Sequence, residues 1–220
     1  MSRNQIHGKR FEDQIKGCGL FDGSADAGRS VHAIFHIEAK FDRSLHLPTS
    51  IKATGGKTVA LADARKFWSL EGPFRLLVGS YLQRGAIKEF GEIHEFIIGA
   101  AELASLRGSA TLREVRAIHE GLGLGPFPAG RHAAAREWAR QQIDCLKPRL
   151  GAVLLNRKID GRGQRRLQCS VPLAQLVSLT EATKILILNR PPVHGYVLHV
   201  DFIGVLALPL RLLSGARERD

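Results

Sequence analysis

Hydrophobic and polar positions alternate with a period of two along several stretches of the chain, and this pattern predicts β-strands. The clearest is VHAIFHIEAKF, residues 31–41, in which every second side chain from Val31 to Phe41 is apolar and the intervening ones include His36, Glu38 and Lys40. Such a strand would have one apolar face and one chemically active face. Further strands are expected at 74–83, 86–99, 151–156, 164–171, 184–189 and 196–207.

Apolar positions at helical spacing predict helices between these strands, over residues 4–18, 58–71, 111–122 and 129–146. Residues 21–30 predict a short strand running into a turn. The stretch LPTSIKATGG that follows the 31–41 strand is rich in turn residues and is predicted to be a loop.

The order of these elements predicts an α+β protein with a central mixed β-sheet flanked by helices. The chain of 220 residues has the length of a single domain with elaborations. Residues 1–107 would form its core, 108–150 a helical insert, and 151–220 a C-terminal β-rich part.

Charge is the unusual feature of the composition. The chain has 32 Lys and Arg against 21 Asp and Glu, a formal net charge of +11, while its hydrophobic content of 44% is ordinary for a folded protein. An excess of this size favours a polyanionic partner such as nucleic acid, because binding phosphates releases their counterions. The alternatives are a charge that serves solubility or a ribosome-bound protein.

The cysteines and the apolar segments indicate where in the cell the protein is expected. Cys18, Cys145 and Cys169 are scattered and odd in number, so we expect reduced, mostly buried thiols in a cytoplasmic protein rather than a disulfide framework or a zinc site. The N-terminus shows no apolar signal region. The most apolar tract, 197–213, is interrupted by Asp201 and Arg211, so no membrane span is predicted.

Glu38 and Lys40 are the candidate centre of chemistry. On a strand they would lie on the same face, about 7 Å apart. A carboxylate can hold Mg²⁺, and a lysine beside it can activate the attacking water and screen charge on a phosphate. Among all 21 acidic residues, only Glu38 has a lysine two positions later. The alternative is an ordinary surface ion pair, worth about 0–1 kcal/mol.

One carboxylate makes a poor Mg²⁺ site, so a second acid should come from a neighbouring strand. Asp26 and Asp22 precede Glu38 by a distance that suits a hairpin, and Glu12 on the first helix could be a third acid. His36 shares the active face, although a phosphate contact or simple solvation is the more ordinary role for it. Asp42 is expected to pair with Arg43 or Lys40.

The order of a helix with Glu12, then Asp26, then IEAK, then a helix and a strand resembles the PD-(D/E)XK nuclease superfamily, in particular type II restriction endonucleases, over residues 4–100. The resemblance implies a central mixed sheet flanked by helices, Mg²⁺-dependent cleavage of DNA and often a homodimer. It makes Asp26 and Glu38 metal ligands, Lys40 the catalytic lysine and Glu12 an auxiliary acid. Ala25 stands where the family motif has proline, which leaves Asp22 open as an alternative to Asp26.

The densest basic stretch, RKIDGRGQRRLQCS at 157–170, contains the predicted DNA-recognition hairpin. Arginine and glutamine side chains bond guanine and adenine edges in the major groove. The candidate contacts are Arg162, Gln164, Arg165, Arg166 and Gln168. The alternative is a solvated charged face. Arg43 and Lys52, in the predicted loop after the 31–41 strand, are expected to position the DNA backbone.

These observations predict a Mg²⁺-dependent, sequence-specific endonuclease of double-stranded DNA, a type II restriction enzyme. It would act as a homodimer, with a cognate methyltransferase as a further candidate partner. One alternative is a structure-specific nuclease, such as a junction resolvase or nickase. The other is a non-catalytic basic protein that binds nucleic acid.

Overall fold

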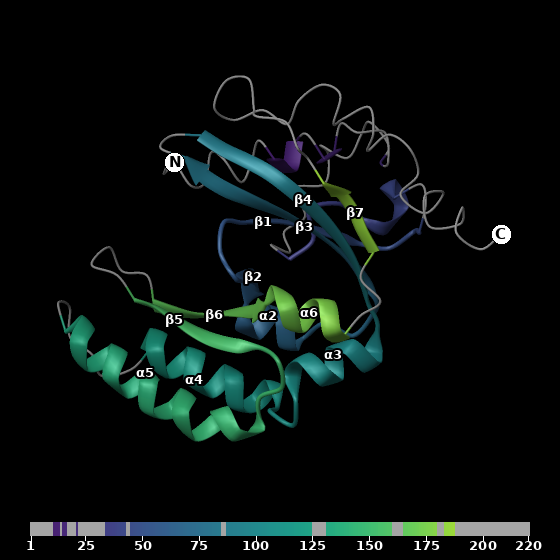
Figure 1. The fold of residues 1–220 in the computed structure, drawn as a ribbon. Coiled ribbons are helices and arrows are strands. Elements are labelled where there is room, and N and C mark those ends of the chain that lie inside the picture. The colour runs from purple at the N-terminus through teal and green to yellow at the C-terminus, as the bar shows by residue number, and fades with distance from the viewer. Residues whose placement is uncertain are drawn as a thin grey trace.

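The computed structural model describes residues 11–13, 15–16, 21, 34–42, 45–84, 87–124, 131–159, 165–179 and 183–187. Within them the protein is α+β, as the sequence predicts, but its strands form two sheets rather than one central sheet (Figure 1). Two sheets arise because β1 and β2, which follow each other in the chain, pair with different partners.

The larger sheet has four strands in the order β1-β3-β4-β7. They are β1 Thr49–Thr54, β3 Phe74–Arg84, β4 Ile87–Ile98 and β7 Thr183–Ile187. β1 runs parallel to β3, whereas β4 is antiparallel to both β3 and β7, so this sheet is mixed.

The smaller sheet is antiparallel and has the order β2-β6-β5. Its strands are β2 Thr58–Asp63, β5 Leu154–Ile159 and β6 Arg165–Pro172. Residues 55–57 are the whole link between β1 in one sheet and β2 in the other. The Thr54 hydroxyl braces this link by donating to the carbonyl of Thr58 at 2.7 Å and by accepting from the Gly56 N–H at 3.2 Å.

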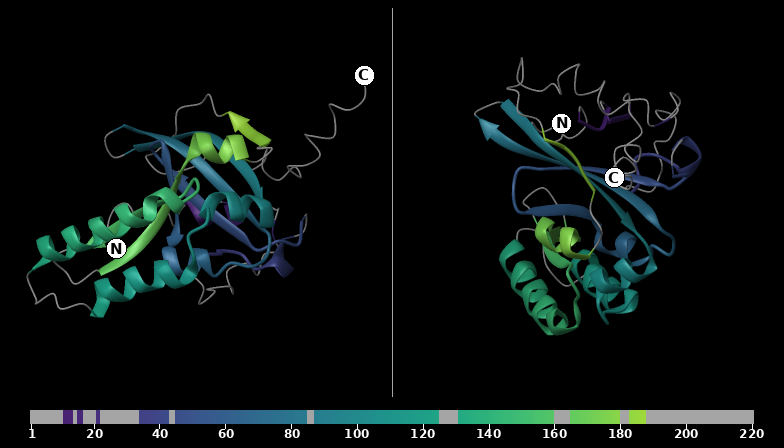
Figure 2. Two further views of the ribbon diagram at one scale, coloured as in Figure 1. Left: turned by 90° about the horizontal axis from the view of Figure 1, so that it is seen from below. Right: turned by 45° about the vertical axis from the view of Figure 1, so that its right-hand side comes forward.

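The helices cover the smaller sheet and its junction with the larger one. In Figures 1 and 2, α4 and α5 lie side by side along β5 and β6, and this helix–hairpin unit extends away from the four-stranded sheet. The short helix η2 lies apart from them, before β1. The bounds are η2 Ala39–Phe41, α2 Ala64–Trp68, α3 Ala100–Arg107, α4 Leu112–Leu124, α5 His132–Leu146, η3 Lys147–Arg149 and α6 Leu173–Leu179.

One cluster of buried apolar side chains runs continuously between the two sheets, from Leu76 and Val78 on β3 to Leu167 and Val171 on β6. Helix α4 contributes to it through Val115 and other residues. Each such side chain, fully buried, stabilises the fold by roughly 1.5–3 kcal/mol. This cluster accounts for one face of the larger sheet.

The opposite face of that sheet meets the helical residues near the N-terminus. Phe11 lies against Gly79 so closely that a Cβ at this position would be 2.4 Å from the ring, and Phe11 also stacks on Phe90 with centroids 4.5 Å apart. Phe11 and Ile15 are both buried and four residues apart. Their packing therefore places Glu12 and Lys16, on the adjacent stripe of the helix, beside the sheet.

Three predicted elements are wrong where the structure describes them. Residues 34–41 do not form a regular strand: they make one isolated bridge, Ile37 to Thr49, and then turn as η2. The predicted loop at 47–56 contains β1. Parallel pairing with β3 stabilises this strand, although turn residues flank it. The predicted helix 58–71 is β2 in its first half, because those residues pair with β6 more than a hundred positions away.

The other described elements match their predictions, although β5 begins and ends three residues later than the predicted strand 151–156. β3, β4, β5, β6 and β7 are present, as are α4 and α5, and the hairpin expected within 157–170 is formed by β5 and β6. Residues 11–13 and 15–16 are helical, as expected, whereas the strand expected at 196–207 lies outside the described residues. Helices α3 and α6 are additional to the prediction.

Cys169 is buried and Cys145 is exposed, and both are free thiols. Burial raises the pKa of the Cys169 thiol to about 12, so it stays protonated at neutral pH. Within the described part of the chain, none of the helices combines the length and the apolar character needed to cross a bilayer.

Candidate functional site

A cluster of titratable side chains lies at the β1 edge of the four-stranded sheet. Glu12 and Lys16 come from the helical residues near the N-terminus, His36 from the segment along the edge of β1, and Lys52 from β1 itself. All four are only partly exposed. Lys16 Nζ lies 2.6 Å from Glu12 Oε1, and His36 Nε2 lies 3.8 Å from Glu12 Oε2.

The backbone of residues 36–37 positions His36 against β1. The N–H groups of both residues donate to the Thr49 carbonyl, and Thr49 donates back to Ile37. The Ile51 N–H then donates to His36 Nδ1 at 2.9 Å. Because Nδ1 accepts a hydrogen bond, the proton of the neutral ring is on Nε2, which is the nitrogen nearer to Glu12.

His36 is neutral at physiological pH. Burial, together with the positive charges of Lys52 and Lys16, lowers the pKa of His36 to about 3. Its approach to Glu12 is therefore that of a neutral imidazole to a carboxylate and not an ion pair. The ring holds the cluster in place without adding charge to it.

Lys52 has the perturbation expected of a reactive amine. Burial lowers its pKa to about 8, and the carboxylate of Glu12 partly opposes that shift. An amine with this pKa is about a tenth neutral at pH 7. Lysines tuned in this way occur at catalytic sites, although structural networks also perturb pKa values.

Glu38 and Lys40 contact each other but not through a strand. Glu38 occupies the N-cap position of η2, and Lys40 Nζ lies 2.9 Å from Glu38 Oε2. Their side chains are 44% and 67% exposed, and the Lys40 ammonium also lies 4.8 Å from the centre of the Phe41 ring. This arrangement is an exposed ion pair of the kind worth about 0–1 kcal/mol.

Asp42 pairs with Arg75, a partner that was not predicted, and the expected partner Arg43 lies outside the described residues. Arg75 on β3 donates from Nη1 to Asp42 Oδ1 at 3.2 Å, and its Nε lies 2.5 Å from Glu95 Oε1 on β4. All three side chains are almost completely buried. This buried triad fixes the end of the 34–42 segment to the centre of the sheet. It was missed because nothing in the local pattern identifies a partner 33 residues away.

The described residues by themselves do not fit a magnesium ion. No group of three or more histidine, cysteine, aspartate or glutamate side chains placed to hold a metal occurs in that part of the chain. Glu12 is the one carboxylate of the edge cluster, and it is already paired with Lys16. Mg²⁺ requires more oxygen ligands than this carboxylate provides.

The predicted site residues thus divide into four sets. Glu12 lies near His36 at the β1 edge, and its charge interacts with that of Lys52, while Glu38 pairs with Lys40 at η2. Arg165, Arg166 and Gln168 lie on β6. Asp22, Asp26, Arg43, Arg162 and Gln164 lie outside the described residues. Lys52 was predicted in a loop but lies on β1, and the chain offers no local signal of its burial.

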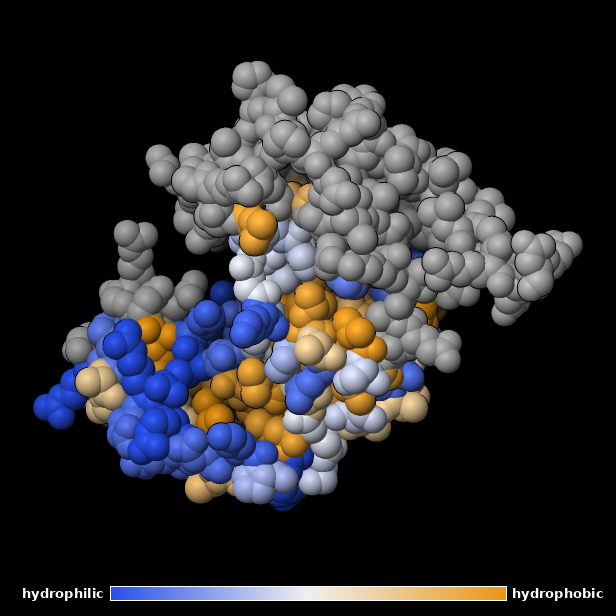
Figure 3. Space-filling view, viewed as in Figure 1, coloured by the Kyte–Doolittle hydropathy of each residue, from blue (hydrophilic) through white to orange (hydrophobic). Residues whose placement is uncertain are grey.

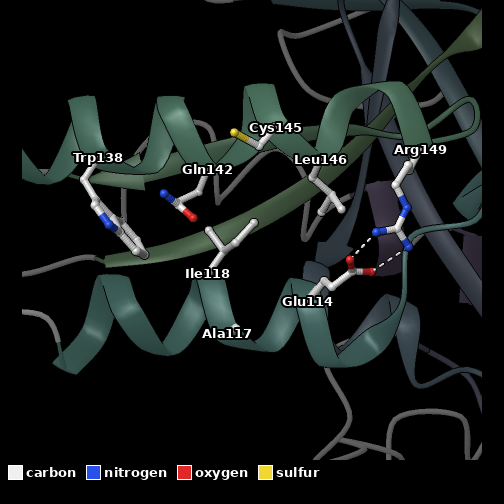
Figure 4. Close-up of a pocket in the computed structure, with 8 residues that line it drawn as sticks. All are labelled: Glu114, Ala117, Ile118, Trp138, Gln142, Cys145, Leu146 and Arg149. Atoms are coloured by element: carbon white, nitrogen blue, oxygen red, sulfur yellow. Dashed lines mark hydrogen bonds and ion pairs between the residues drawn. The ribbon is translucent and has the colours of Figure 1, made fainter.

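A separate cavity of about 340 Å³ lies between α4 and α5 (Figure 4). Trp138 borders one end and the ion pair of Glu114 with Arg149 the other, with Ile118 and Leu146 between them. Hydrogen bonds from Thr111 and Arg149 lower the pKa of Glu114 to about 2, so this pair stays charged. The lining contains no nucleophile with an adjacent base, and we therefore take the edge cluster as the candidate site.

We expect His36→Asn to make the protein less sensitive to acid. The folded state keeps this imidazole neutral down to pH about 3, whereas the unfolded chain takes up a proton near pH 6.5. Protonation therefore favours the unfolded state as the pH falls. His36 alone should reduce the free energy of unfolding by roughly 2 kcal/mol between pH 7 and pH 5.

Urea denaturation at these two pH values measures the effect, and asparagine keeps an acceptor for the Ile51 N–H. The matched control is His46→Asn, because His46 is exposed and its φ of 53° is one that asparagine also adopts. An equal loss of stability in wild type and His36→Asn would show that His36 is not the buried neutral group described above.

The edge cluster therefore combines two lysines, one carboxylate and one neutral imidazole on a partly buried sheet edge. Similarity to known proteins can test such a site independently. Comparison of the chain with protein-family models, with curated proteins and with solved structures finds no match.

Proposed function

We propose that the protein is a nuclease that hydrolyses phosphodiester bonds in double-stranded DNA, and that the cluster of Glu12, Lys16, His36 and Lys52 is its reaction site. The observation that carries the proposal is Lys52, a partly buried lysine on a sheet-edge strand, close enough to Glu12 for their charges to interact. The net charge of +11 supports a polyanionic substrate.

The cluster suits a phosphate electrostatically. Lys16 and Lys52 carry positive charge, Glu12 carries negative charge and His36 is neutral, so positive charge exceeds negative charge. The excess can stabilise the charge that develops on the phosphoryl oxygens. The neutral fraction of Lys52 can accept a proton from the attacking water, because its pKa of about 8 lies close to the working pH.

Magnesium is part of the proposal, although the described residues do not by themselves form a site for it. When bound, Mg²⁺ would polarise the phosphoryl group and lower the pKa of the attacking water. Glu12 is the described acid whose charge partly opposes the lowering of the Lys52 pKa, and a second acid is predicted at Asp26 or Asp22. The proposal extends to a type II restriction enzyme with a restriction-endonuclease-like core, acting as a homodimer alongside a cognate methyltransferase. The mixed four-stranded sheet supports it.

Lys52 is the stronger candidate for the catalytic lysine, and Lys40 is its rival. Lys40 is two-thirds exposed and paired with Glu38, so water screens its charge. Lys52 is partly buried, where an electrostatic interaction with a phosphate is stronger. The exposed Glu38–Lys40 pair favours the second candidate function, a non-catalytic protein that binds nucleic acid.

The decisive experiment is incubation of the purified protein with supercoiled plasmid and phage DNA, in Mg²⁺ and in EDTA. We expect discrete linear fragments in Mg²⁺ and intact DNA in EDTA. Nicked circles, or cleavage of branched substrates alone, would assign the protein to the structure-specific nucleases. DNA that is intact but shifted on a gel under both conditions would contradict the nuclease proposal and support a binding protein.

A further inference from the structure

The hairpin of β5 and β6 has two faces of opposite character. Leu155 and Ile159 on β5 and Leu167 and Cys169 on β6 point to one face and are buried in the core shared with α4 and α5. The other face points away from that core. It carries Leu154, Asn156 and Lys158 on β5 and Arg166, Gln168 and Ser170 on β6.

Positive charges meet directly on this outward face. Lys158 and Arg166 are opposite each other in the antiparallel register, and both are exposed. Like charges in this position repel each other and destabilise the pair. Within the described part of the chain, neither residue has an acidic partner. The repulsion is relieved when an anion binds across both.

The next cross-strand pair consists of two amides, Asn156 and Gln168. The amide nitrogen of Asn156 donates to Ser170 Oγ at 2.8 Å, which fixes its orientation on the sheet. Gln168 is partly exposed and lies two residues from Arg166, on the same face of β6. Amide and basic side chains in adjacent pairs match the donors and acceptors on base-pair edges. In Figure 3 hydrophilic side chains gather over the region where α5 lies in Figure 1, next to an apolar patch.

We propose that the outward face of the β5–β6 hairpin, centred on the Lys158–Arg166 and Asn156–Gln168 pairs, binds double-stranded DNA in its major groove. This inference rests on the proposed function and adds Lys158 and Asn156 to the contacts expected from the sequence. It keeps the major groove as the site of contact and divides the roles: Lys158 and Arg166 would contact phosphates, and Gln168 would contact base edges.

Duplex DNA fits this face better than the other nucleic acids. A two-stranded ribbon enters the major groove of B-DNA, which is about 12 Å wide, but not the deep and narrow major groove of double-stranded RNA. Single strands are held mainly by stacking on aromatic rings. The outward face, from Leu154 to Lys158 and from Arg166 to Ser170, has no aromatic residue.

Fluorescence anisotropy with a 5′-labelled duplex tests the proposal in EDTA, over a range of KCl concentrations. The test variant is the double substitution Lys158→Gln with Arg166→Gln. The matched control is Arg157→Gln, because Arg157 is also exposed but faces α5, where it lies near Glu137. We expect the double variant to bind about tenfold more weakly at moderate salt and the slope of log K against log salt to fall by about 2. The control should bind like wild type.

Wild-type affinity in the double variant would overturn the proposal, as would an equal loss in Arg157→Gln or tighter binding of single-stranded DNA or double-stranded RNA. Because EDTA prevents metal-dependent cleavage, the result is separate from catalysis. If wild type binds duplex through this face but never cuts it in Mg²⁺, the nuclease proposal fails alone. If the double variant binds and cuts like wild type, the hairpin proposal fails alone.

Discussion

Replacing Lys52 with methionine is expected to reduce DNA cleavage by about a hundredfold or more, the usual effect of removing a general base. The same substitution should stabilise the fold. Lys52 loses affinity for its proton on folding, from the ordinary pKa of 10.5 to about 8, so its burial costs up to about 3 kcal/mol below pH 8. That cost disappears as the pH rises from 8 to 10.5, where the unfolded chain also loses the proton.

Cleavage rates and urea denaturation between pH 7 and pH 10 measure both effects. Wild type should become more stable over this range relative to Lys52→Met. The matched control is Lys40→Met, which removes an exposed lysine from the rival site and should leave the rate nearly unchanged. If Lys40→Met abolishes cleavage and Lys52→Met does not, the reaction takes place at the Glu38–Lys40 pair.

Replacing Arg75 with methionine is expected to destabilise the protein by about 3–5 kcal/mol, a large part of the stability of most domains. Methionine fills much of the volume but leaves the carboxylates of Asp42 and Glu95 without their shared counter-charge. Both are almost completely buried. The loss should appear as a lower urea midpoint, measured by circular dichroism.

Two further variants separate the buried charge from the packing. The triple variant Asp42→Asn, Arg75→Met, Glu95→Gln removes all the charges together and should recover much of the loss, since no buried carboxylate remains unpaired. Arg140→Met removes an arginine that also bonds two acids, Glu137 and Asp144, but on an exposed face of α5. Its midpoint should change little. A small effect of Arg75→Met would show that the triad is not important for folding.

Long segments with a strong pattern could be predicted from the sequence. β3 and β4 pair along almost their full length, so local alternation and pairing agree. Helices α4 and α5 have apolar stripes at helical spacing that face the shared core. In each case the local pattern and the tertiary contacts favour the same structure.

The segments that were predicted wrongly depend on distant partners. The alternation of residues 34–41 suggested a strand, but His36 is held by the backbone of β1 and Asp42 by Arg75, and the chain turns between them. Lys52 lies in a stretch with turn residues on both sides, and it becomes part of a strand only through its pairing with β3. Of the residues predicted as catalytic, only Glu12 belongs to the described edge cluster, and its neighbours there were not predicted to lie with it. The spacing between Glu38 and Lys40 predicted a pair that the structure places on the surface.

The three-residue link between β1 and β2 has a consequence for how the protein could change during evolution. Lys52 lies on β1 just before the link, and β2, just after it, pairs directly with β6. The distance from Lys52 to the outward face of the hairpin is therefore set by backbone pairing and not by the side chains on that face. Substitutions at Lys158, Arg166 or Gln168 can alter what the hairpin contacts without moving Lys52. Specificity and chemistry could then diverge separately on one rigid frame.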